Sequence, residues 1–173
     1  SYLSMSLNFN GFGFLFNLLF LLGILFLINI FKNSYLGLFF VFLFTGFLGF
    51  DLGPILNKFL SIRNGNEIIA LSFFSTAFIF FSLSFYVIFT KKNFDFLGSF
   101  LFVGFFVIFI FFLFNFILSI PLFSLVLSGL IVFISSLFIL YDTSRIVNGC
   151  ENNYLIATIS LFLNIYNMFI SLI

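Results

Sequence analysis

The sequence lacks histidine and tryptophan altogether and contains a single cysteine, Cys150. Without histidine, the chain cannot form a Ser-His or Cys-His nucleophile pair, a histidine-ligated zinc site or the HExxH motif of metalloproteases. One cysteine cannot form a disulfide within the chain. These absences exclude intramembrane proteases of the serine and zinc types, and we expect a protein that is not an enzyme and has no resident cofactor.

Charged residues are also scarce. Six basic and five acidic side chains make up 6% of the 173 residues and give a net charge of +1, whereas soluble domains contain about 25% charged residues. So few charges cannot cover the surface of a soluble globule, and the absence of a basic stripe argues against nucleic-acid binding. We expect neither a nucleic acid nor a small-molecule substrate as a partner.

Apolar residues are abundant instead. They make up 64% of the chain, 37 of them are Phe, and the mean hydropathy is +1.37. This composition indicates that membrane lipid surrounds the protein. The abundant Phe, Ile, Leu and Asn can all be written with AT-rich codons, which indicates an AT-biased genome such as that of an endosymbiont or an organelle.

Six apolar runs are long enough to cross a bilayer as helices, which takes about 20 residues. They cover residues 9–31, 35–56, 68–89, 96–118, 121–147 and 154–173. The sequence therefore predicts an all-α, polytopic transmembrane helical bundle, with residues 1–173 forming a single integral membrane domain. Lys32, Lys91, Lys92 and Arg145 lie in one set of alternate loops and only two basic residues in the other, which favours a cytoplasmic position for the first set.

Polar side chains within the last two runs lie on one helical face each. Ser160, Asn164 and Asn167 are spaced by four and three residues, and Ser135 precedes Asp142 by seven. Positions that face lipid do not need such residues. We therefore expect the two faces to point inward, either at each other or at a water-filled cavity.

Asp142 is the main candidate functional residue. A carboxylate in a membrane helix costs about 2.5–3.5 kcal/mol on insertion scales and often marks an ion or proton pathway. Two simpler interpretations stay open: solvation near the membrane interface, and pairing with Arg145 on the same helical face. If the chain turns back about Cys150, Asp142 lies opposite Ile159, about 7 Å from the level of Asn164.

Asn164 and Asn167 are candidates for the same pathway, as is Ser160. Their simpler interpretation is an interhelical hydrogen bond that holds two helices together. A stripe of small residues, Gly46, Gly49 and Gly53, would let another helix approach closely, either within this fold or from a partner.

Several segments of the chain match a known pattern when they are taken in order. They are Thr45-Gly46-Phe47-Leu48-Gly49-Phe50, Gly53-Pro54-Ile55-Leu56-Asn57, Tyr141-Asp142-Thr143-Ser144-Arg145-Ile146, Glu151-Asn152-Asn153-Tyr154 and Tyr166-Asn167-Met168-Phe169. Together they resemble the Bax-inhibitor-type membrane family, and among its branches the bacterial YccA-like one. The resemblance covers nearly the whole chain from about Lys32 onward.

The resemblance implies a multi-pass protein of the bacterial inner membrane that binds and modulates the protease FtsH. It also implies a fold of seven helices with the last at the centre of the other six. Only six runs are visible in this sequence, so we expect the first family helix to be missing or degenerate. Other branches of the family are linked to calcium leak and to suppression of cell death.

The calcium chemistry of the family is attributed to two aspartates that share a proton across the last two helices. The first maps onto Asp142, but the second maps onto Asn164. An amide oxygen can still coordinate calcium, so Asp142 stays a candidate calcium ligand, but an amide cannot share a proton with a carboxylate. A pH-sensitive calcium or cation leak is therefore the alternative function, weakened by Asn164. A third hypothesis, a small subunit of a respiratory complex, fits the length and the Phe content.

Overall fold

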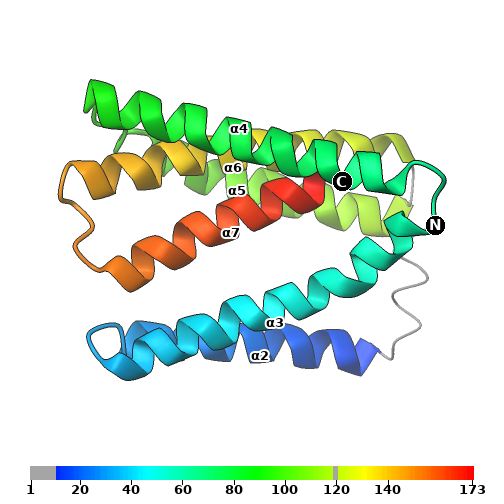
Figure 1. The fold of residues 1–173 in the computed structure, drawn as a ribbon, viewed down its shortest axis with the longest axis horizontal. Helices are drawn as coiled ribbons and strands as arrows, with labels where there is room; N and C mark the ends of the chain where they lie inside the picture. Colours follow the sequence, from blue (N-terminus) through cyan, green and yellow to red (C-terminus); the bar gives the residue numbers. More distant parts are fainter. Residues whose placement is uncertain (1–10, 119–120) are drawn as a thin grey trace. The chain divides into compact units, whose positions relative to one another are not determined.

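The computed structural model describes residues 11–118 and 121–173, and the regular elements in those residues are all α-helices (Figure 1). The helices are α2 (Gly11–Ile30), α3 (Tyr35–Leu60), α4 (Gly65–Thr90), α5 (Leu97–Leu118), α6 (Pro121–Val147) and α7 (Tyr154–Leu172). Five helices in the described ranges, α3 to α7, contain stretches long and apolar enough to cross a membrane, and Leu19–Ile30 of α2 is a shorter apolar stretch. The predicted all-α transmembrane fold is confirmed.

The helix boundaries differ from the expected runs mainly around the α3–α4 turn. The run expected to stop at residue 56 continues to Leu60, with Lys58 in the last turn, where a basic residue is favourable. Pro54 lies inside this helix, as prolines can in membrane helices. α4 begins at Gly65, ahead of the expected residue 68, with Glu67 in its first turn. Residues 9 and 10 of the first expected run lie outside the described residues.

The chain divides into two compact units, and the division falls within α3, between Asp51 and Leu52. In the first unit, α2 and the first part of α3 form a hairpin (Figure 1). The rings of Phe20 and Phe47 hold it together with centroids 4.9 Å apart. The second unit contains the end of α3 and α4 to α7, and it carries the polar residues of the last two helices.

Within the second unit, α6 is the shared neighbour: it packs against α4, α5 and α7, and α4 also packs against α7. Val87, Ile139 and Met168 are completely buried between these helices. A Cβ added to Gly104 of α5 would lie only 2.6 Å from Cδ1 of Ile134, so this glycine lets α5 and α6 approach closely. The packing brings the C-terminal part of α6 alongside the N-terminal part of α7.

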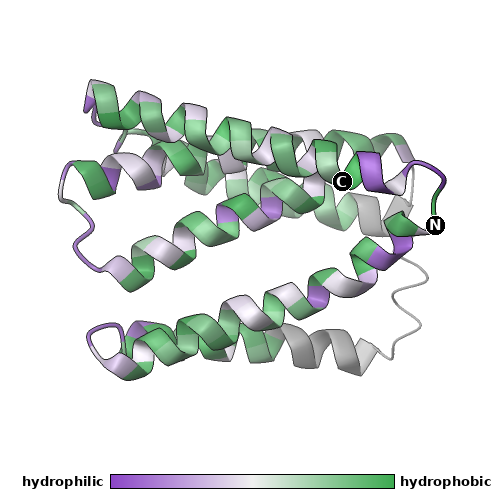
Figure 2. Ribbon diagram, viewed as in Figure 1, coloured by the Kyte–Doolittle hydropathy of each residue, from purple (hydrophilic) through white to green (hydrophobic). Residues whose placement is uncertain are grey.

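Apolar residues extend along the helices, while hydrophilic residues concentrate in the loops and at a few positions of α3 and α7 (Figure 2). Many large apolar side chains are exposed, among them Phe89 at 82% and Phe78 at 75%. In water such a surface would drive association. In a bilayer it is the surface that contacts lipid.

Candidate functional site around Asp142

Asp142 lies near the C-terminal end of α6 and forms side-chain hydrogen bonds with α7. Its Oδ2 atom accepts hydrogen bonds from the Ser160 hydroxyl and from the Asn164 side-chain amide, the latter at 2.8 Å. Ser160 and Asn164 are one helical turn apart on α7, which lets both reach the same oxygen. Asp142 of the one predicted face thus meets Ser160 and Asn164 of the other.

The loop between Val147 and Tyr154 fixes the register of the two helices. At the end of α6, the backbone amides of Cys150 and Glu151 both donate to the carbonyl of Arg145. Gly149 has a φ of +72°, a left-handed conformation that glycine adopts at helix C-termini without a Cβ penalty. Asn153 then caps α7, because its Oδ1 accepts from the amides of Leu155 and Ile156. Both helix ends are closed by residues of the loop itself.

Arg145 forms its ion pair with this loop. Its guanidinium lies 3.7 Å from a carboxylate oxygen of Glu151. It also donates to the Tyr141 hydroxyl at 3.4 Å and lies 5.5 Å from the centre of the Tyr141 ring. Of the two simpler interpretations of Asp142, pairing with Arg145 is not what the described residues show. The partners of Asp142 are the two neutral donors on α7.

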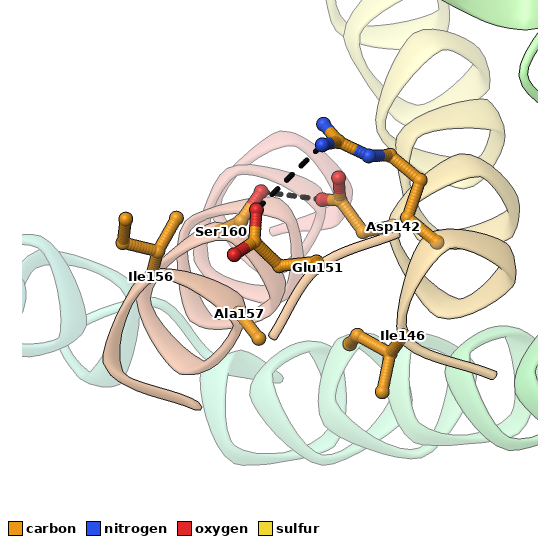
Figure 3. A pocket seen from close by; sticks show the side chains of 7 residues that line it. Asp142, Ile146, Glu151, Ile156, Ala157 and Ser160 are labelled. Carbon is orange, nitrogen blue, oxygen red and sulfur yellow. Dashed lines mark hydrogen bonds and ion pairs between the residues drawn. The ribbon is translucent and has the colours of Figure 1, made fainter. Parts of the chain in front are cut away.

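A small cavity of about 70 Å³ opens beside Asp142. Figure 3 shows Asp142 and Ser160 on one side of it, with the carboxylate of Glu151 close by. Arg145 lines it as well, and the apolar wall comes from Ile146, Ile156 and Ala157. The cavity is large enough for one or two water molecules. It therefore offers a polar space next to a membrane carboxylate, at the end of the helices where α6 and α7 are connected.

The chemistry of this site is that of hydrogen bonding and charge rather than of bond cleavage. Asp142 and Glu151 supply carboxylate oxygens, and Ser160 supplies a hydroxyl. Calcium usually takes six to eight oxygen ligands. Across residues 11–118 and 121–173, no group of three His, Cys, Asp or Glu side chains could hold a metal ion. Calcium coordination by Asp142 stays a prediction.

The other residues singled out from the sequence lie apart from the cavity. Asn164 is buried, but Asn167, three residues further along α7, is exposed. Gly46, Gly49 and Gly53 are exposed as well, and a Cβ added to any of them would meet no heavy atom within 4 Å. The described residues make no close helix contact at this glycine stripe, so its packing against a partner stays a prediction.

Two residues beside the site belong to the family-like segments of the sequence but were not predicted as site residues. Glu151 is a loop residue with no helical periodicity, and only its opposite charge to Arg145, six residues earlier, could have signalled their ion pair. Ser144 is completely buried on α6. Its hydroxyl donates to the carbonyl of Lys92 at 3.1 Å and accepts from the amide of Phe94 at 3.0 Å. Ser144 therefore fastens the α4–α5 loop to the helix that carries Asp142.

Comparison with known proteins gives one family for the whole chain and several bacterial relatives. Residues 1–173 match the family described as inhibitor of apoptosis-promoting Bax1. An uncharacterized protein of Pseudomonas aeruginosa is 46% identical over 151 residues, which is 87% of this chain and 68% of the relative. The modulator of FtsH protease YccA of Escherichia coli K12 is 43% identical with the same coverage of both chains. The same identity holds for a protein of E. coli O6:H1 named inner membrane protein YccA.

Proposed function

This chain belongs to the family of inhibitors of apoptosis-promoting Bax1, and on that premise we propose that it binds the membrane protease FtsH and modulates the degradation of membrane proteins. It acts in the bacterial inner membrane and performs no bond chemistry of its own. The observation that carries the proposal is the 43% identity, over 87% of the chain, to the E. coli protein named as a modulator of FtsH protease.

The physical basis of this proposal is contact between membrane helices. Five described helices contain apolar stretches long enough to span the bilayer, and their outer faces expose large apolar side chains. Helices associate in lipid through close packing and a few polar contacts. If the chain binds FtsH through such contacts, it would either compete with a membrane substrate for the protease or change the activity of the protease.

The test is co-purification followed by a degradation assay. The full chain and FtsH are purified together in mild detergent, and the degradation rate of a membrane substrate is measured with and without the chain. A stable complex and slower degradation are expected, with no effect from an equal amount of an unrelated multi-pass protein. Neither association nor a change in rate would contradict the proposal.

The amount of the chain itself must be followed in the same reaction. A modulator persists while the substrate is degraded more slowly. If the chain disappears at a rate that accounts for the protection of the substrate, it is a competing substrate of FtsH and the proposed role is wrong.

A second candidate function is an ion leak pathway through Asp142. It is favoured by one observation: a polar cavity of about 70 Å³ lies directly beside this membrane carboxylate. Calcium flux into proteoliposomes tests it. Asp142→Asn preserves the shape of the side chain and removes its charge, and we expect it to abolish flux. The matched control is Asp95→Asn, at an exposed position before α5. Unchanged flux in Asp142→Asn would rule the pathway out.

A further inference from the structure

Arg145 shares a cavity with two carboxylates and forms an ion pair with one of them. Asp142, Arg145 and Glu151 all line the cavity of about 70 Å³. Asp142 lies three residues before Arg145 on α6, a spacing at which side chains of opposite charge are neighbours and attract each other. In the described residues, however, the ion pair of Arg145 is with Glu151, at 3.7 Å. Because Asp142 is within reach as well, the choice of Glu151 needs a structural cause.

Glu151 is held in place by the loop before α7. Its backbone amide donates to the carbonyl of Arg145 at 3.1 Å, and its Oε1 atom accepts from the amide of Asn153 at 3.1 Å. Asn153 is itself the N-cap of α7. Since Oε1 is occupied in this way, Oε2 is the oxygen that pairs with the guanidinium. Glu151 therefore presents a fixed negative charge to Arg145.

Tyr141 is the second group that holds the guanidinium. Its hydroxyl, one turn earlier on α6, accepts from Arg145 at 3.4 Å, and the guanidinium lies over the Tyr141 ring, 5.5 Å from its centre. A cation within about 6 Å of the centre of an aromatic ring is attracted to its face. The ring lies against α5, where a Cβ added to Gly98 would be 3.3 Å from the Tyr141 hydroxyl. Tyr141 is thus fixed by packing and in turn fixes Arg145.

One oxygen of the Asp142 carboxylate has no donor among the described residues. Both hydrogen bonds to the carboxylate, from Ser160 and Asn164, go to Oδ2. In the same part of the chain, no buried side-chain oxygen or nitrogen lacks a partner, so Oδ1 is accessible rather than buried. Figure 3 shows the Asp142 carboxylate beside the cavity. Oδ1 is the oxygen that a guanidinium would take, because charge-assisted hydrogen bonds between Arg and carboxylates are strong.

We infer that Glu151 and Tyr141 are positioning residues that hold Arg145 away from Asp142, so that Oδ1 of the carboxylate stays open to the cavity. Without them, Arg145 turns to Asp142, neutralises its charge and fills the space beside it. The polar character of the cavity thus depends on the loop between α6 and α7, which carries Glu151. This role is independent of FtsH binding, and it holds whether the cavity takes an ion or only water.

Solid-state NMR of the full chain in lipid bilayers tests this inference. Aspartate is labelled with ¹³C at the side-chain carboxyl, and arginine with ¹⁵N in the guanidinium. The chain contains three aspartates and two arginines, so the spectra are simple. Asp142→Asn identifies the Asp142 signal, and Arg145→Lys removes the guanidinium label at that position. The dipolar coupling between the two labels reports how close Arg145 lies to Asp142.

The main variant is Glu151→Gln. Glutamine keeps an oxygen for the Asn153 amide, but its side-chain nitrogen is a donor and cannot pair with a guanidinium, which has only donors. The matched control is Glu67→Gln, which removes the same charge at an exposed position in the first turn of α4. Tyr141→Phe is the second variant, since it keeps the ring and removes only the hydroxyl.

We expect a weak coupling between Arg145 and Asp142 in the parent and a rise of at least about twofold in Glu151→Gln, because a charge-assisted N–H···O bond shortens to about 2.8 Å. A smaller rise is expected in Tyr141→Phe and none in Glu67→Gln. Thermal unfolding shows whether each variant keeps the fold.

An unchanged coupling in a folded Glu151→Gln variant would overturn the inference. So would an equal rise in Glu67→Gln, or a coupling in the parent as strong as that in Glu151→Gln. If Glu151→Gln does not fold, Tyr141→Phe decides in the same way: a rise supports the inference and an unchanged coupling overturns it.

Discussion

The side-chain amide of Asn164 on α7 donates a hydrogen bond of 2.8 Å to Oδ2 of Asp142 on α6. A buried amide and a membrane carboxylate therefore satisfy each other across the interface between the last two helices. This relationship explains how the fold accommodates Asp142: the carboxylate is stabilised by neutral donors on α7, while the nearby Arg145 is paired with Glu151. Because the donors lie on α7, the geometry of the site depends on how α6 and α7 pack against each other.

Removing the amide should destabilise the fold. In Asn164→Ala, Asp142 keeps only the Ser160 hydroxyl as a donor, and losing a hydrogen bond to a charged group costs about 1.5–3 kcal/mol. The control is Asn167→Ala, because Asn167 is exposed on the same helix, and there we expect a change within about 0.5 kcal/mol. Unfolding of both variants in detergent is compared with the parent. Equal effects of the two substitutions would show that the hydrogen bond contributes little.

Placing a second carboxylate at this position should make the stability depend on pH. In Asn164→Asp, the two carboxylates can share a proton at about pH 5 but repel each other when both are ionised at about pH 8. We expect the melting temperature of the variant, relative to the parent at the same pH, to fall by several degrees as the pH rises across this range. Asn167→Asp is the control, since its position is exposed and away from Asp142. A parallel pH profile for Asn164→Asp and the parent would contradict direct coupling between the two positions.

Removal of the Ser144 hydroxyl should loosen the α4–α5 loop. The hydroxyl bonds both the Lys92 carbonyl and the Phe94 amide. Ser144→Ala therefore leaves the Phe94 amide without this partner and the Lys92 carbonyl with only the Asn148 side-chain amide, at 3.5 Å. We expect a loss of about 1–3 kcal/mol and faster hydrogen exchange at the Phe94 amide. The control is Ser136→Ala, because the Ser136 hydroxyl bonds only the Val132 carbonyl within its own helix. If hydrogen exchange at the Phe94 amide were unchanged in Ser144→Ala, the Ser144 hydroxyl would not hold the α4–α5 loop in place.

Sequence periodicity could predict the helices and the main pair of the site, because both depend on regular spacing. The turn about Cys150 places Asp142 and Asn164 on facing sides, and the structure brings them into contact. Periodicity could not predict the ion pair of Arg145 with Glu151, which depends on the irregular loop between α6 and α7. Nor could it distinguish glycines that are needed for close approach, such as Gly104 against Ile134, from exposed ones such as Gly46. That distinction requires the position of the neighbouring helix.

Two glycines of the α3–α4 region give the sharpest test of this distinction. A Cβ at Gly65 would lie 1.8 Å from the carbonyl oxygen of Phe59, a backbone atom that cannot move without reshaping the turn, whereas a Cβ at Gly49 meets nothing within 4 Å. We expect Gly65→Ala to destabilise the protein by at least about 2 kcal/mol, in the upper range for single substitutions that strain the backbone. Gly49→Ala should leave stability unchanged or raise it slightly, since alanine favours a helix by up to about 1 kcal/mol over glycine. Thermal unfolding of the two variants measures the difference. If the two substitutions had the same effect, the turn would not require glycine.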